Sequence, residues 1–178
     1  MENGFALFFA ACYFSDQKLY RRAERLLRTE LKEQILGDGG HFERSPMYHQ
    51  ELLHRILDCV NLAKNNPELG EKLAVRLRSR AAAMVGWLRQ MTFRDGRIPL
   101  FKDSAGGIAP SSRQLRDYAG RLGVNQSGDS KPLPLGESGY RRASGNQYEI
   151  IVDVLDMNTR KRRVARSHIE VPQNPPGL

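Results

Sequence analysis

The chain has 178 residues, a formal net charge of +8 and a hydrophobic content of 40%. This length allows one ordinary domain with a sizeable core, and no apolar run approaches the roughly 20 residues of a membrane span. Cys12 and Cys59 are too few for a disulfide framework, and their positions on apolar helical stripes predict two buried free thiols.

The excess of positive charge is uneven along the chain. Five basic residues and Glu170 follow residue 156, so a local charge of +4 lies there and +4 is left for residues 1–156. The folded part is therefore predicted to be only mildly basic. Such a surface suits an anionic polysaccharide and equally suits many other soluble proteins, so charge alone assigns no partner.

The first two predicted elements are helices. Residues 4–14 predict a short helix that is apolar on nearly every side, which is typical of a helix buried within a larger protein. Glu2 stands where a signal peptide would carry basic residues, and polar Ser15-Asp16 follows, so the segment is not interpreted as a signal peptide. Ser15 is the expected N-cap of a second helix, with apolar residues at helical spacing over 19–35.

The second helix ends at a glycine-dense loop, residues 37–40, whose backbone can take positive φ and approach a ligand closely. Ser45 and Pro46 predict the start of a third helix, as its N-cap and first helical residue. A fourth helix is expected over 69–91. After an irregular stretch, a fifth and shorter helix with a serine cap is expected over 111–123.

A weak internal repeat links these helices. The stretch Gln34–Gly39 recurs as Gln90–Gly96, and the two Asp-Gly pairs stand 57 residues apart with a helical hairpin between them. Hairpins repeated in this way bury their faces only against their neighbours. The sequence therefore predicts an all-α fold, a partial (α/α) toroid of helical hairpins, with a short β segment on its C-terminal side.

The chain changes character after the fifth helix. Gly, Ser and Pro are frequent over 124–138, and β-branched residues over 148–154 predict a strand, with 139–141 as its expected partner. The predicted organisation is a toroid fragment over 1–123, a linker over 124–138, the first strands of a β-sandwich over 139–156 and a disordered basic tail over 157–178.

The segment Asp38–His49 carries the most chemistry. Beside the glycine turn it places the polar residues His41, Glu43, Arg44, Tyr48 and His49. Tyr48 and His49 fall in the first turn of a helix, where the positive end of the dipole favours developing anions, and Glu43 could pair with Arg44. A half-buried structural tyrosine and surface or capping histidines are the alternative interpretation. The sequence has no zinc signature, phosphate loop or dinucleotide fingerprint, so it predicts neither a metal nor a cofactor.

These residues resemble the heparinase II/III-like polysaccharide lyases, and the resemblance runs in order over about 1–154. The stretches that carry it are Glu2–Leu7, Gln34–Leu36, Asp38–His49, Asp95–Ser104, Ser138–Tyr140 and Ile151–Val154. The resemblance implies an (α/α) toroid followed by an antiparallel β-sandwich. It also implies β-elimination at a uronate, in which a base removes the C5 proton and an acid protonates the departing O4.

The family's proton-transfer tyrosine lies in an S-P-x-Y-H motif, so the resemblance implies Tyr48 as the catalytic residue. His41, Glu43, Arg44 and His49 are expected to bind substrate or to orient the loop. The expected partner is an anionic polysaccharide, such as heparan sulfate, a related glycosaminoglycan or alginate. Family members often act in the periplasm or outside the cell, and a cytoplasmic location and the oligomeric state stay open.

The chain also departs from the family's pattern. The family's carboxylate-neutralising asparagine belongs to an N-H pair that would precede Met1-Glu2-Asn3, and Asn3 does not match it. After the V-D-V strand, the family's G-H-A-H-A-D-type strand is replaced by an arginine-rich stretch in which His168 cannot be equated with the family's histidine. We hypothesise an out-of-frame tail, and we predict little or no lyase activity from this chain alone.

Two alternatives come from other classes of protein. A non-catalytic carbohydrate-binding helical module would keep the cleft and the basic surface without turnover. A nucleic-acid-binding protein would use the basic run Arg160–Arg166, but no aromatic residues interleave with that run, so we predict no nucleic-acid partner.

Overall fold

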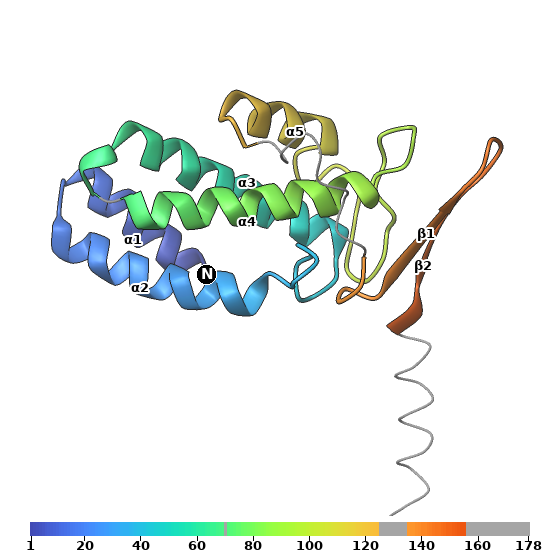
Figure 1. Cartoon of the computed structure of the whole chain (residues 1–178), viewed down its shortest axis with the longest axis horizontal. Helices are drawn as coiled ribbons and strands as arrows, with labels where there is room; N and C mark the ends of the chain where they lie inside the picture. The colour runs from blue at the N-terminus through green and yellow to red at the C-terminus, as the bar shows by residue number, and fades with distance from the viewer. Residues whose placement is uncertain (70, 125–134, 156–178) are drawn as a thin grey trace, which may run out of the picture.

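The computed structural model describes residues 1–69, 71–124 and 135–155. Within these ranges the chain is mostly helical, which confirms the predicted fold class (Figure 1). The elements are α1 Glu2–Tyr13, α2 Gln17–Gln34, α3 Pro46–Asn65, the 3-10 turn η1 Pro67–Leu69, α4 Glu71–Gln90, α5 Ser112–Arg121, β1 Tyr140–Ser144 and β2 Glu149–Asp153. The arrangement of further hairpins into a toroid stays a prediction.

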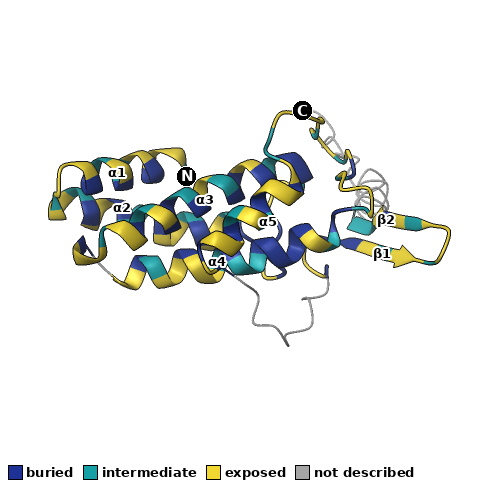
Figure 2. Cartoon of the chain, turned by 90° about the horizontal axis from the view of Figure 1, so that it is seen from above, coloured by how far each residue is buried: buried dark blue, intermediate teal, exposed yellow. Residues whose placement is uncertain are grey.

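The helices form two hairpins that lie side by side, α1 with α2 and α3 with α4 (Figure 1). Their apolar stripes share one core, and the exposed residues lie on the outward faces (Figure 2). Leu27, Leu53, Ile56 and Leu77 are fully buried in this core, and α5 packs against α3 and α4. Cys12 and Cys59 are buried free thiols, as predicted.

Helix starts follow their capping residues. The Ser45 hydroxyl accepts a hydrogen bond from the Tyr48 amide at 3.4 Å, with Pro46 as first helical residue, as predicted. The Ser15 prediction was wrong, because Asp16 is the N-cap of α2 and its carboxylate accepts bonds from two amides, Lys18 N at 2.6 Å and Leu19 N at 3.1 Å. Ser15 lies in the turn between α1 and α2 with a positive φ of 51°, and the Asp16 carboxylate caps α2 one residue later.

The two strands form an antiparallel hairpin whose register pairs Tyr140 with Asp153. A second apolar cluster attaches this hairpin to the end of α4, and its buried members are Trp87, Met91, Leu135, Tyr140 and Ile151. The strand hairpin therefore starts beside the loop that joins α2 to α3 (Figure 1).

Part of the predicted domain organisation falls outside the described residues. That is the case for residues 125–134 of the predicted linker and for the predicted tail 157–178. The described end of the linker is packed, because Leu135 and Ser138 are both buried. No helix in the described ranges combines the length and the apolar character that crossing a bilayer requires.

Candidate functional site

The loop between α2 and α3 is closed by its own backbone. Leu36 N donates to Gly40 O at 2.8 Å, and Phe42 N donates to Gln34 O at 2.9 Å. Gly39 has a φ of +89°, and a Cβ at this position would lie 2.4 Å from the carbonyl oxygen of Ala83 in α4. The sequence predicted that this glycine loop could approach a ligand closely, and the structure shows instead a close approach of Gly39 to the backbone of α4. This contact fixes the position of the residues that follow.

Asp38 ties the same loop to the entry of the strand hairpin. Its carboxylate is buried and accepts hydrogen bonds from Gly40 N at 3.0 Å, Ser138 N at 2.8 Å and the Ser138 hydroxyl at 2.6 Å. The indole of Trp87 donates to the Ser138 hydroxyl at 3.0 Å. Asp38 was not among the predicted site residues, although Asp38 and Ser138 both lie in stretches that carry the family resemblance.

Arg44 lies at the junction of helices and strands. Its Nε donates to Ser138 O at 2.9 Å, its guanidinium forms an ion pair with Asp153, and it lies 5.6 Å from the centre of the Tyr140 ring. The Tyr140 hydroxyl donates in turn to Arg44 O. The ion pair of Arg44 is therefore with Asp153 and not with the neighbouring Glu43, whose side chain is exposed.

His49 points into the protein. It is fully buried, its Nε2 lies 3.1 Å from Met84 O, and its ring centre lies 4.3 Å from that of Trp87. Burial, with a smaller contribution from nearby His41, lowers the pKa of His49 to about 3, so its ring is neutral at pH 7. The structure thus places His49 behind the loop, where it supports α4 and Trp87.

His41 and Tyr48 lie together in a hollow that His49 does not line. The hollow encloses about 330 Å³ between the start of α1, the end of α2 and the first turns of α3, and its other lining residues are Glu2, Gln34, Glu51, Leu52 and Arg55. Tyr48 is half-buried, and His41 is almost completely buried. Of the predicted site residues in the described chain, the structure brings these two together and leaves Glu43, Arg44 and His49 outside the lining.

The groups in this hollow suit proton transfer next to an anion. Burial lowers the pKa of His41 to about 4, so its imidazole is neutral at pH 7 and can accept a hydrogen bond. Tyr48 stands at the positive end of the α3 dipole, where negative charge on a phenol is stabilised. Arg55 adds a cation two turns along the same helix face. Arg55 and Glu51 were not among the predicted site residues, although they follow Tyr48 at spacings of seven and three.

Larger hollows lie elsewhere in the described chain, one of about 850 Å³ between α2 and α4 and one of about 670 Å³ along the loop that precedes α5. Neither is lined by a residue of the predicted site. No cluster of three or more His, Cys, Asp or Glu side chains able to hold a metal lies among the described residues.

The fold and the hollow define a class: a domain of helical hairpins with a tyrosine at a helix start beside a buried neutral histidine. A family model described as heparinase II/III N-terminus matches residues 13–123, from the end of α1 to the end of α5. This match spans well over half of the chain, and the chain belongs to the heparinase II/III family. No curated protein and no solved structure matches the chain.

Proposed function

We propose that this chain is a part of a polysaccharide lyase that cleaves uronate-containing chains by β-elimination, with Tyr48 as its proton-transfer residue. The observation that carries the proposal is the position of Tyr48 and His41 in one hollow, inside the segment matched by the heparinase II/III family model. Three groups there suit this reaction. The phenol of Tyr48 at a helix start can transfer a proton, the guanidinium of Arg55 can hold the uronate carboxylate, and the neutral imidazole of His41 can accept a hydrogen bond.

The proposed reaction removes the C5 proton of a uronate and breaks the C4–O4 bond. Tyr48, as phenolate, accepts the C5 proton, and the electron pair of the C5–H bond delocalises onto the uronate carboxylate to give an enolate. His41 accepts a hydrogen bond and so helps to orient the reacting groups. That pair then forms the C4=C5 double bond while O4 departs and takes up a proton from the Tyr48 hydroxyl. Arg55 is proposed to hold the carboxylate, so that the enolate forms next to a positive charge.

The remaining predicted residues have different proposed parts. Arg44 and His49 act on the substrate only indirectly, since their contacts with Asp153, Met84 and Trp87 fix the loop and the start of α3. Exposed Glu43 stands next to the loop residues and is proposed to contact sugar hydroxyls. The proposed substrates are heparan sulfate, a related glycosaminoglycan or alginate, encountered in the periplasm or outside the cell.

The test is a lyase assay on a panel of these three polymers that follows the ultraviolet absorbance of the new double bond. It is run at high protein concentration, because only a small residual rate is expected from the chain alone. Because general acid–base catalysis contributes roughly 100-fold or more, Tyr48→Phe is expected to lower the rate by at least that factor. Tyr13→Phe is a matched control, since Tyr13 is 84% exposed on α1 and outside the hollow. A measurable residual rate that is equal in wild type and Tyr48→Phe would contradict the proposal.

The second candidate is a carbohydrate-binding helical module without turnover. It is favoured by the contacts of Arg44 and His49, which leave only Tyr48 and His41 of the predicted group in the hollow. Saturable binding of a uronate oligosaccharide, weakened by Arg55→Ser but never followed by a double-bond signal, would support this candidate over the lyase.

A further inference from the structure

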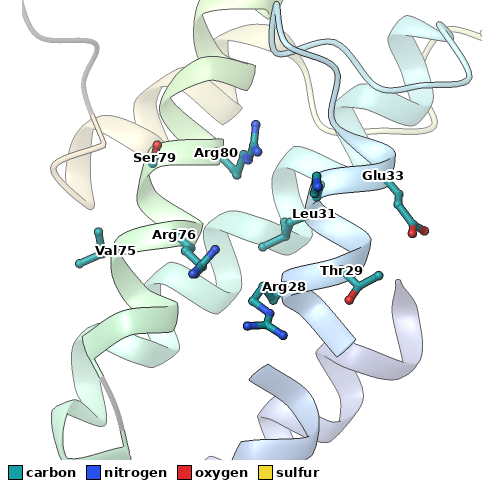
Figure 3. A pocket seen from close by; sticks show the side chains of 9 residues that line it. Arg28, Thr29, Leu31, Glu33, Val75, Arg76, Ser79 and Arg80 are labelled. Atoms are coloured by element: carbon teal, nitrogen blue, oxygen red, sulfur yellow. The ribbon is translucent and has the colours of Figure 1, made fainter. Parts of the chain in front are cut away.

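A groove between α2 and α4 is lined by positive charge. It encloses about 850 Å³, and its cations are Arg28 and Lys32 on α2 and Arg76 and Arg80 on α4. Figure 3 shows Arg76 and Arg80 extending from α4 toward α2. One carboxylate, Glu33 on α2, also lines the groove, so cations outnumber carboxylates in the lining by four to one. Buried Leu31 lies between the two rows and gives the groove an apolar floor.

The charge is concentrated on these two helices. Helix α2 carries six Lys or Arg residues against three carboxylates, and α4 carries five against one. By contrast, α1 has a single carboxylate and no Lys or Arg, and α3 has two of each sign. Within the described ranges, none of the four groove cations is paired with a carboxylate, so their charge is available to a ligand.

The spacing of these cations suits a linear polyanion. Arg28 and Lys32 stand four residues apart on one face of α2, and Arg76 and Arg80 do so on α4, which places successive cations about 6 Å apart along each helix. Two facing rows at that pitch can hold an extended chain that carries a charge on each of its repeating units. Arginine, which makes up three of the four, presents a planar fork that matches carboxylate and sulfate groups.

We infer that this groove is a second binding site for an acidic polysaccharide, separate from the Tyr48 hollow, with which it shares no lining residue. The choice of polymer rests on the proposed function, whereas the binding of a polyanion rests on the groove itself. Thr29 and Ser79 supply hydroxyl groups for sugar hydroxyls along its walls. No aromatic side chain lines the groove, so it lacks the stacking surface that single-stranded nucleic acids use.

The test measures binding of a fluorescently labelled heparin octasaccharide by anisotropy at several salt concentrations. The double variant Arg28→Ser/Arg76→Ser removes one cation from each row. Arg22→Ser/Arg78→Ser is the matched control, because it removes the same charge from the same two helices at exposed positions outside the groove. We expect a roughly tenfold weaker affinity and a shallower salt dependence for the groove variant, and less than about a twofold change for the control.

Equal weakening by both variants would overturn the inference, because it would show a diffuse effect of net charge. Absence of any change in either variant would also overturn it. Tighter binding of a single-stranded DNA oligomer, lost in the groove variant, would replace the polysaccharide with a nucleic acid. Failure of the proposed function looks different: heparin binding would depend on Arg28 and Arg76, while Tyr48→Phe would leave a measurable residual lyase rate unchanged.

Discussion

The two Asp-Gly turns of the chain share their local structure and differ in what surrounds them. Asp38-Gly39 follows α2 and Asp95-Gly96 follows α4, with φ angles of +89° and +85° at the glycines. Asp38 is buried and bonds to Gly40 and Ser138, whereas the exposed Asp95 bonds to Arg97. A Cβ on Gly39 would collide with α4, while a Cβ on Gly96 would meet nothing within 4 Å.

This difference separates what local sequence encodes from what packing adds. An Asp-Gly pair after a helix is enough to form the turn in both places. Only the first turn is wedged between α4 and the entry of the strand hairpin, and only this turn is followed by His41 and Tyr48. A site that transfers protons needs its groups held in a fixed geometry, so the packed turn is the one suited to carry it.

The largest expected difference between the two turns comes from adding one methyl group. Gly39→Ala should lower the free energy of unfolding by about 4 kcal/mol, because it forces a clash with the Ala83 carbonyl and a strained φ. Gly96→Ala has the same φ problem without the clash and should cost only about 1 kcal/mol. Urea unfolding of both variants measures this, and equal losses would show that α4 does not constrain the first turn.

Removing the two aspartates should give the next largest difference. Asp38→Ala leaves Gly40 N, Ser138 N and the Ser138 hydroxyl without their acceptor in a buried site, which should cost about 3 kcal/mol. Asp95→Ala affects an exposed carboxylate and should change the melting temperature very little. A large loss of stability in Asp95→Ala would contradict the distinction drawn between the turns.

Acidification should act through the histidines beside the first turn. The pKa of His41 is lowered to about 4 and that of His49 to about 3, from 6.5, so the unfolded chain takes up protons first. The contribution of each neutral histidine to the free energy of unfolding is therefore fully present above about pH 6.5. It declines as the pH falls toward the pKa in the folded state, and about 2 kcal/mol per histidine is lost at pH 5. His41→Gln should lose about 2 kcal/mol less stability than wild type between pH 7 and pH 5, and an unchanged loss would mean that burial does not lower the pKa of His41.

Sequence patterns were sufficient for most of the fold. Apolar spacing predicted five helices, and Ser45-Pro46 marked the start of α3, because both signals are local. The N-cap of α2 was assigned to Ser15, but the structure has Asp16 in this role. Either side chain can accept hydrogen bonds from the first amides of the helix, and only the geometry of the turn selects one of them.

The direction of individual site residues was harder to predict. Tyr48 and His49 are adjacent on one helix turn, so they point about 100° apart, and sequence alone did not say which faces α4. The contacts of Arg44 with Ser138 and Asp153 join segments about 100 residues apart in the sequence, as the packing of β1 and β2 requires. The groove was missed for the same reason: each row of cations is visible as a four-residue spacing, but their meeting depends on how α2 packs beside α4.

The central claim is that the hollow beside the first Asp-Gly turn binds a uronate, and a titration followed by amide NMR tests it most directly. A uronate trisaccharide should shift the signals of Gly40, His41, Tyr48 and Arg55 in a saturable way, with no shift at Asp95-Gly96. The same titration of Arg55→Ser should show weaker binding at these positions. Shifts confined to the second turn, or none at the hollow at saturating trisaccharide, would contradict the account.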